Sequence, residues 1–509
     1  MKLKVKNMVL FFNKHNKKKL TNKSKPIKIV FEQAKKSSDF HQYSPFDDSD
    51  RLLISYYKSM VDVEKVNRLL LPSIQKHIGK TTNLDDIKNY IPFDDLHIVK
   101  DGSDVQNKLM QGYAMIQLNE LYTQFLAVNI ENNGLGIRKN NDTENEFTVV
   151  GPKVGFIENM DVNIHLLRNK ISISDLVIEE VIIGSMSKTK VAIAYLDGIT
   201  NPQNIQTVRQ RLKDIDLDVV FDNSHIDQIL SDNSNTIFPT FISTERIDKA
   251  VFSLVQGQIA VLSNGSPYVI TGPATLMNFF ITPEDYYFPW IVGSFFRVIR
   301  YFSVIFSIFA TPLYVAILTF HYEVIPEVLL GPLINSRANV PFPPVLEVIF
   351  MELTIELLRE AGARLPTKVG QTLGIVGGIV IGQATVEAAL TSNILLIIVA
   401  LSALASFTTP NYTMSNAIRV LRFPFIVTAA LWGGLGIAIG MVFLFGHLLR
   451  LKSFGTPYLV PLFPFRRKNF RDSFIRSSFD YTTARSKFLR PLKMRRYTPK
   501  RDREDINNE

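Results

Sequence analysis

The 509-residue sequence contains no cysteine. This absence excludes a disulfide framework, a cysteine-ligated zinc or iron–sulfur site and a thiol nucleophile. Common catalytic motifs are also missing: no H-E-x-x-H, G-x-S-x-G or G-x-G-x-x-G occurs, and Gly79-Lys80-Thr81 lacks the first glycine of a phosphate loop because Ile74 stands there. The eight histidines are scattered singly, with none at metal-ligand spacing from another. We therefore expect no enzymatic activity, no metal site and no cofactor.

Charge is scarce in one long region of the chain. The 165 residues from Tyr286 to Arg450 carry only nine Lys or Arg and seven Asp or Glu, about 10% charged, against about 26% in the other 344 residues. A quarter is usual for soluble globular protein, and a tenth is not. The sequence therefore predicts a soluble head followed by a membrane domain over residues 284–450.

Three segments of this region have the length and apolar composition to cross about 30 Å of hydrocarbon: Phe302–Phe320, Thr391–Thr409 and Phe425–Gly446. Trp290, Arg297 and Arg300 precede the first span. Aromatic and basic residues at this place are typical of a cytoplasmic membrane interface. We expect the first span to leave the cytoplasm.

A fourth apolar segment has glycine at every fourth position: Gly370, Gly374, Gly378 and Gly382. This spacing puts all four on one face of a helix, where small residues let another helix approach backbone to backbone. Gly436 and Gly440 repeat the spacing in the last span. We interpret all six as helix-packing positions, and we expect the protein to self-associate.

An acidic stripe marks the stretch Val345–Gly362, where Glu352, Glu356 and Glu360 recur every four residues and Arg359 lies within reach of Glu356. Charges inside a membrane are expensive and usually face a partner or water. One interpretation is that the stripe, with Glu387, lines an ion path. The other is an interfacial amphipathic helix whose carboxylates point into water.

The number of spans depends on this stretch. If it crosses the membrane there are five spans, and the tail lies outside. If it lies flat or re-enters there are four, and head and tail are both cytoplasmic. The tail carries 13 Lys and Arg between Arg466 and Arg501, and positive charge favours the cytoplasmic side. We therefore predict four spans.

Both ends of the chain are basic. The first 28 residues contain ten lysines and no acidic residue, and their apolar run is too short for a signal-peptide core. Beside membrane spans, such segments favour cytoplasmic retention and contact with anionic lipid over nucleic-acid binding. We expect residues 1–47 and the basic tail, 451–509, to be largely disordered.

The head has the pattern of an α/β fold. Val191–Gly198 is typical of a buried strand, Asn201–Leu212 of a helix with an Asn-Pro start, and Leu217–Phe221 of a second strand, which together predict a βαβ unit. Leu109-Met-Gln-Gly112 and Leu254-Val-Gln-Gly257 each precede an apolar hairpin pattern. We predict two α/β subdomains, 48–135 and 168–283, joined by a linker, 136–167.

Nine motifs follow one another from about residue 150 to 462. They are Gly151–Glu158, Tyr195–Gly198, Pro283–Tyr287, Pro341–Gly362, Arg364–Pro366, Gly370-Gln371, Ile381–Ala388, Leu421–Pro424 and Ser453–Tyr458. In these motifs the chain resembles the A subunits of bacterial spore germinant receptors, the GerA family, with weaker similarity back to about residue 48.

The resemblance implies a multi-pass protein of the spore inner membrane that helps nutrients trigger germination. Family members work with a transporter-like B subunit and a lipoprotein C subunit, and the A subunit is thought to form an oligomeric cation-conducting pore with its head on the core side. Two alternatives stay open. One is a stage V sporulation protein similar to these A subunits, which aids release of dipicolinate and ions; the other is a membrane scaffold without a pore.

Overall fold

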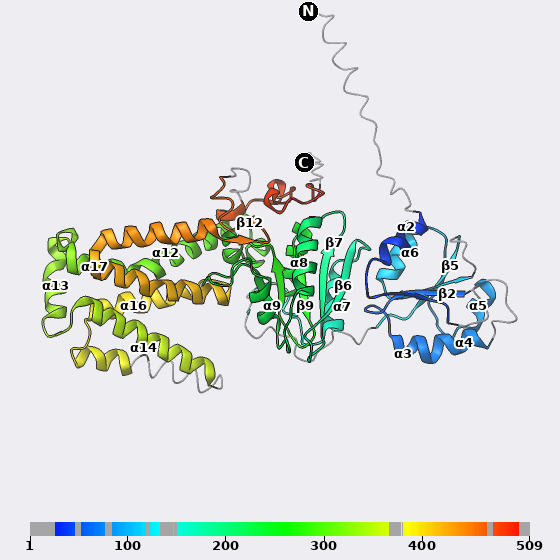
Figure 1. The fold of residues 1–509 in the computed structure, drawn as a ribbon, viewed down its shortest axis with the longest axis horizontal. Helices are drawn as coiled ribbons and strands as arrows, with labels where there is room; N and C mark the ends of the chain where they lie inside the picture. The colour runs from blue at the N-terminus through cyan, green and yellow to red at the C-terminus, as the bar shows by residue number, and fades with distance from the viewer. Residues whose placement is uncertain are drawn as a thin grey trace, which may run out of the picture. The chain divides into compact units, whose positions relative to one another are not determined.

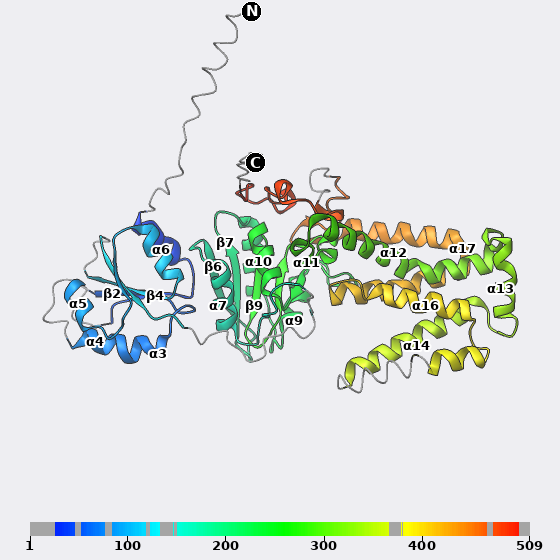
Figure 2. The same cartoon turned by 180° about the vertical axis from the view of Figure 1, so that it is seen from behind.

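A computed structural model describes residues 26–45, 52–76, 84–118, 123–132, 146, 150–365, 378, 380–465 and 472–497. The chain divides into two compact units. The first comprises Met1–Gly136 with Arg168–Glu179, and the second comprises Ile137–Leu167 with Glu180–Glu509. Figures 1 and 2 show the elements of both units from opposite sides.

The first unit is built on a five-stranded sheet of order β1-β2-β4-β5-β3, with every neighbouring pair antiparallel. Its strands are β1 (Phe40–Tyr43), β2 (Leu52–Tyr57), β3 (Leu96–Val99), β4 (Tyr113–Leu118) and β5 (Phe125–Asn129). Its helices are α2 (Ile27–Ala34), α3 (Val63–Lys65), α4 (Leu71–Gln75), α5 (Leu84–Tyr90) and α6 (Gly102–Met110), with a π-helical turn at Val66–Leu70.

Helices cover both faces of this sheet because its central strands are almost continuously apolar, and successive side chains of a strand point to opposite faces. On one face α2 and α6 pack over Tyr57, Met115 and Phe125. On the other, the helices from α3 to α5 pack over Ile54 and Ile116. Residues 27–43 form α2 and β1, which corrects the expected disorder of this part of the N-terminal segment: the amphipathic α2 has a sheet face to bury against.

The second sheet repeats the topology of the first, with order β6-β7-β9-β10-β8. Its strands are β6 (Leu176–Ile183), β7 (Thr189–Leu196), β8 (Ile242–Thr244), β9 (Ile259–Ser263) and β10 (Val269–Gly272), and its helices are α7 (Met160–Lys170), α8 (Pro202–Lys213), α9 (Asn223–Leu230) and α10 (Ile247–Gln256). In each half a helix precedes two strands, further helices lead to the edge strand, and one more helix leads into the last hairpin. The two halves are therefore structural repeats.

The predicted helix–glycine–hairpin repeat is confirmed. Gly112 follows α6 and Gly257 caps α10, both at positive φ, and antiparallel pairs follow each. The predicted βαβ unit is wrong, because Leu217–Phe221 forms no strand and β7 instead pairs with β9, antiparallel. The segment runs beside the β6–β7 turn, where Ser185 N bonds to Leu217 O.

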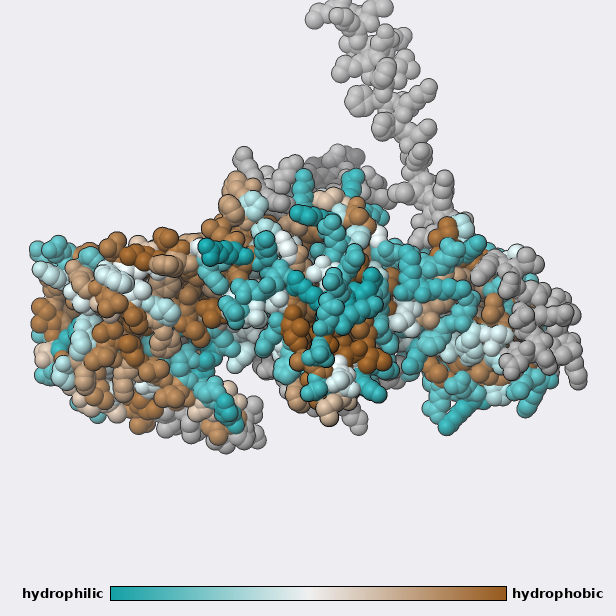
Figure 3. Space-filling model, viewed as in Figure 1, coloured by the Kyte–Doolittle hydropathy of each residue, from teal (hydrophilic) through white to brown (hydrophobic). Residues whose placement is uncertain are grey.

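A helical domain follows the second sheet. A short helix, α11 (Glu284–Tyr287), leads into α12 (Trp290–Phe320), α13 (Glu327–Arg337), α14 (Pro344–Arg364), α16 (Asn393–Ser406) and α17 (Tyr412–Arg450), and residues 380–387 are also helical. Among the described residues, α12 and α17 have the length and composition to cross a membrane, and α16 is a shorter apolar helix. On the face seen in Figure 3, apolar side chains spread over this domain.

Helix α17 is broken at Gly433, whose φ of 57° and ψ of −136° are not helical. Beyond it the chain folds back, because a Cβ on Gly436 would lie 1.9 Å from the Thr428 carbonyl oxygen and one on Gly440 would meet the Phe425 ring at 2.7 Å. In a continuous helix residues 425 and 440 would be about 22 Å apart. The single span predicted at Phe425–Gly446 is therefore two antiparallel helices.

The tail returns to the head. After α17 come two short strands, β11 (Lys452–Ser453) and β12 (Thr456–Pro457). Residues 472–497 then lie against the second subdomain and the start of the helical domain: Arg476 donates to the Phe288 carbonyl at 2.9 Å, and Arg485 donates to the Val255 carbonyl at 2.7 Å. This corrects the expected disorder of that part of the tail, since guanidinium groups can each satisfy several backbone carbonyls.

Candidate functional site

The helical domain has a polar interior. On α12, Ser303, Ser307 and Thr311 recur every four residues and are all buried. They share one face of the helix, which the other helices cover. On α16, Ser402 and Ser406 are buried as well. A bundle that faced lipid outside and packed only apolar side chains inside would not need these hydroxyl groups.

Four helices meet at one level of this interior. Arg422 of α17 forms an ion pair with Glu352 of α14, and its Nη2 donates to Ser307 Oγ of α12 at 2.8 Å. Ser402 of α16 donates to the Ser307 carbonyl at 3.4 Å. We refer to Ser307, Glu352, Ser402 and Arg422 as the central layer. The side chains of Glu352 and Arg422 are 1% and 2% exposed.

The central layer is not fully satisfied. Oε1 of Glu352 and Nε of Arg422 are buried without a hydrogen-bond partner among the residues that the structure describes. A buried ion pair offsets its desolvation only when its remaining donors and acceptors are also met. Two unmet polar atoms at one point leave a place where water or a small ion would be stabilised.

A second polar layer lies nearer the head. Arg359 donates to Glu356 Oε2 from Nε at 3.0 Å and reaches Asn416 Oδ1 at 3.2 Å. Arg419 donates to the same Asn416 oxygen, and its Nε is 3.9 Å from Glu356 Oε1. We refer to Glu356, Arg359, Asn416 and Arg419 as the head-side layer. It is less buried, with the Glu356 and Arg359 side chains 23% and 27% exposed.

The other end of α14 also carries an ion pair. Glu347 is paired with Arg337 of α13 at 2.6 Å, and close by Tyr314 of α12 bonds to Ser392 at 3.1 Å. At this end His321 accepts from the Gly434 backbone at 3.1 Å, where α17 turns back. Ion pairs to α13 and α17 therefore hold α14 at three levels along its length.

The structure brings together some of the residues singled out from the sequence and separates others. Glu352, Glu356 and Arg359 lie in the two layers. Glu387 is exposed and bonded to Gln383 at 2.8 Å, away from them. The interfacial interpretation placed all the carboxylates of α14 in water; this is wrong for Glu352, although Glu360 is exposed beside Arg364.

The glycine positions have different surroundings. Gly370 and Gly374 lie outside the described residues. A Cβ on Gly378 would meet nothing within 4 Å, and one on Gly382 would touch Leu396 at 3.7 Å. The close contacts at Gly436 and Gly440 are between the two halves of α17. These two glycines thus lie at a contact within one chain.

Sequence reasoning missed the partners of the acidic stripe. Neither Arg419 nor Arg422 was singled out from the sequence, and Ser307 was not singled out either. A usable signal was present: small hydroxyl residues every four positions in an otherwise apolar span indicate a face that packs against polar groups. No periodicity, however, links Glu352 to a residue 70 positions away.

An α/β head joined to apolar helices with buried ion pairs is the architecture of a membrane protein with a soluble domain. A profile described as Bacillus/Clostridium GerA spore germination protein matches residues 27–488. The chain belongs to this family.

Relatives in the family cover nearly the whole chain. Spore germination protein GerQA of Bacillus cereus is 46% identical over 478 residues, 94% of this chain and 95% of the relative. Spore germination protein A1 of Bacillus subtilis (strain 168) is 37% identical over 421 residues, 83% and 86% of the two chains. The crystal structure of the N-terminal domain of the A subunit of the Bacillus megaterium spore germinant receptor GerK3 aligns with 49% of this chain and 94% of that one, with 25% identity and a TM-score of 0.37.

Proposed function

We propose that this chain is the A subunit of a nutrient germinant receptor in the spore inner membrane. It acts as a conducting oligomer that releases cations when a nutrient binds to a partner, and it catalyses no reaction. The partners are a transporter-like B subunit and a lipoprotein C subunit. The head and the tail face the spore core, where the basic segments at both ends contact anionic lipid.

The observation that carries the conduction proposal is the central layer. Charged groups within membrane helices are expensive, and they persist where they bind or pass ions or where they fix the packing of helices. Glu352 and Arg422 keep unmet polar atoms, and the head-side layer continues the polar interior toward the head. Two successive polar layers of this kind support movement of ions or water along α14 and α17.

Two other functions predict different behaviour. A stage V sporulation protein of similar sequence would act in dipicolinate release after germination has begun. A membrane scaffold would recruit partners through its head and conduct nothing. The names of the relatives above, all spore germination proteins, favour the receptor.

The first experiment measures potassium release and then dipicolinate release from purified spores, with and without this gene. We expect potassium release to be lost for some nutrients only, and those nutrients identify the input of the receptor. Normal potassium release with slow dipicolinate release for every nutrient would show instead that the sporulation alternative is right. No change in either, with related genes deleted, would contradict both.

The second experiment tests conduction with Glu352→Gln. The matched control is Glu360→Gln, which removes an exposed carboxylate two turns further along the same helix. We expect Glu352→Gln to change the rate or the cation preference of release at normal protein level, and the control to have no effect. Equal ion release from both variants would favour the scaffold.

A further inference from the structure

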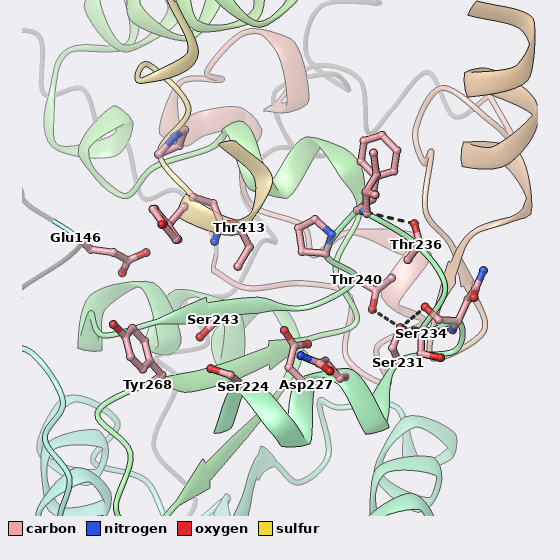
Figure 4. Close-up of a pocket in the computed structure, with 18 of the residues that line it drawn as sticks. Glu146, Ser224, Asp227, Ser231, Ser234, Thr236, Thr240, Ser243, Tyr268 and Thr413 are labelled. Carbon is pink, nitrogen blue, oxygen red and sulfur yellow. Dashed lines mark hydrogen bonds between the residues drawn. The ribbon is translucent and has the colours of Figure 1, made fainter. Parts of the chain in front are cut away.

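A cavity of about 780 Å³ lies in the second unit, between the head and the helical domain. Its walls come from α9 and the segment that follows it, from Ser243 of β8, from Tyr268 and from Pro410–Thr413, the connection between α16 and α17. Figure 4 shows these side chains around one open space. The volume is in the range of pockets that enclose small molecules. We refer to it as the junction pocket.

About half of the side chains that line the junction pocket carry a hydroxyl group, and several of these hydroxyl groups are already held in place. Ser231 and Thr240 bond to each other at 3.0 Å. Thr236 accepts from the Phe238 backbone at 3.2 Å and bonds to His447 Nε2 at 2.9 Å. These contacts fix the wall without the help of a ligand.

Other polar groups in the wall have no partner. The side chains of Asp227, Ser234 and Ser243 line the pocket, and none of them has a hydrogen-bond or ion-pair partner among the described residues. In Figure 4 the Asp227 carboxylate projects from α9 into the space that Ser243 and Thr413 also border. The pocket thus offers free donors and acceptors on the head side.

Asp227 supplies the unbalanced charge. The other carboxylate of the wall, Glu146, is neutralised by Lys249 at 2.8 Å and accepts from Thr244. No Lys or Arg of the described chain lines the pocket. Because its carboxylate loses hydration without gaining a cation, the pKa of Asp227 is raised to about 7.

We propose that the junction pocket binds a small hydrophilic amine, with its ammonium group on Asp227 and its hydroxyl or amide groups on Ser234 and Ser243. An ammonium group restores the missing counter-charge, and short polar substituents match the hydroxyl wall. The cavity can hold more than a bare ion, and three unpaired oxygen-bearing side chains favour an organic cation with several hydrogen-bonding groups. This inference does not rest on conduction, because the pocket lies outside the two polar layers.

The position of the pocket allows such a ligand to act on the helical domain. Thr413 of the wall lies one turn before Asn416 of the head-side layer, and Ala363 of the wall lies one turn after Arg359 of that layer. A bound amine would therefore touch the head, the end of α14 and the start of α17 together. Binding would change how freely these ends move.

Affinity should depend on pH, since only ionised Asp227 attracts an ammonium group. With a pKa of about 7, the ionised fraction rises about tenfold from pH 6 to pH 8. The other titratable groups of the wall are Glu146, held by Lys249, and Tyr268 and Tyr412. Behind it, His447 bonds to Thr236 and Asp232 pairs with Arg211 at 2.6 Å.

The test uses the full chain purified in detergent and 2-amino-1,3-propanediol as the probe. Glycerol is the neutral counterpart, with a hydroxyl group in place of the ammonium group. Ligand-observed NMR gives the dissociation constant of each compound at pH 6 and pH 8. We expect the amine to bind at least tenfold more tightly than glycerol at pH 8, and about tenfold more weakly at pH 6 than at pH 8.

Two variants locate the site. Asp227→Asn keeps the shape of the side chain and should abolish the preference for the amine. Asp216→Asn, which removes an exposed carboxylate of the same subdomain outside the pocket, should leave the preference unchanged. Equal binding of amine and glycerol to the unaltered chain, or amine binding that survives in Asp227→Asn, would overturn the proposal. Neither result bears on conduction, which the Glu352 experiment tests separately.

Discussion

The head and the helical domain each contain a deeply buried ion pair, and the two pairs differ in how fully they are satisfied. In the first unit, Asp39 accepts two hydrogen bonds from Arg168 and one each from Ser37 and Ser59, at 2.5 to 2.7 Å. The Arg168 guanidinium lies over the Tyr57 ring, 4.1 Å from its centroid. In the helical domain, Glu352 and Arg422 keep polar atoms without partners.

This difference separates a structural pair from a candidate functional pair. Arg168 of α7 binds Asp39 in the loop before β1, and both carboxylate oxygens of Asp39 accept hydrogen bonds from groups of the protein. A fully satisfied buried network makes packing unique. A partly satisfied network has a higher free energy and remains where a ligand or ion completes it. Four sets of substitutions test whether the two ion pairs differ in this way.

The largest effect is expected for Asp39→Ala in the first unit. It leaves Arg168 buried without its counter-charge, so the free energy of unfolding should fall by about 3–5 kcal/mol. Urea unfolding of the full chain in detergent, followed by circular dichroism, measures the change. Asp94→Ala, an exposed carboxylate of the same unit, is the control. A loss below 1 kcal/mol would contradict the structural role.

The same pair predicts a response to acid. Burial alone would raise the pKa of Asp39, but the charge of Arg168 and the hydrogen bonds of Arg168, Ser59 and Ser37 hold it below the usual value of 3.8. The stabilisation is therefore complete above pH 3.8 and is lost as the pH falls through the lowered pKa. The difference in the free energy of unfolding between the unaltered chain and Asp39→Ala should therefore become smaller only in that acidic range.

The second change concerns the central layer. Glu352→Gln removes one charge-assisted interaction of Arg422, and a loss of about 1.5–3 kcal/mol is expected. Glu352→Gln with Arg422→Met removes both charges and should restore thermal stability. If the layer serves ion passage, the double variant stays defective in potassium release although it is stable. Recovery of both stability and potassium release would show that the central layer serves only to pack the helices, as the Asp39–Arg168 pair serves only to pack the head.

The third change tests how the helical domain closes around the central layer. Gly433→Ala places a Cβ 2.9 Å from Phe320 at a backbone conformation that favours glycine. We therefore expect the free energy of unfolding to fall by about 1–3 kcal/mol.

The fold-back itself can be measured with Leu421→Cys and Leu444→Cys in one chain, because both side chains line one apolar hollow. A short bismaleimide should join them; in a straight helix they would be about 35 Å apart.

The smallest effect is expected for Asp227→Asn, because its side chain is only half-buried and solvent screens part of its charge. An aspartate that ionises near pH 3.8 in the unfolded chain ionises near 7 in the fold, so its ionisation opposes folding, and stability falls from about pH 4 to pH 7 and stays low above it. Asp227→Asn cannot ionise at this position, so its stability lacks this fall between pH 4 and pH 7. We expect its melting temperature to exceed that of the unaltered chain by a few degrees at pH 8 and to equal it near pH 4. A constant difference across this range would argue against an unpaired carboxylate.

Local features of the head were predictable from the sequence. The Asn201-Pro202 start of α8 is confirmed, with Asn201 accepting from Gln203 N at 3.0 Å, because a cap is decided by neighbours in the chain. The glycine ends of α6 and α10 are confirmed for the same reason. The strand predicted at Leu217–Phe221 is wrong because its apolar pattern permits a strand but does not choose a partner, and β9 occupies the neighbouring position.

Composition, motifs and short-range spacing were enough to predict the division into head and apolar helices, the family, and the acidic stripe of α14. The fold-back of α17 at Gly433 and the pairing of Glu352 with Arg422, 70 residues away, could be read only from the tertiary structure. Helical periodicity shows which residues share one face of a helix. It does not show which distant helix packs against that face, because the whole bundle decides that packing.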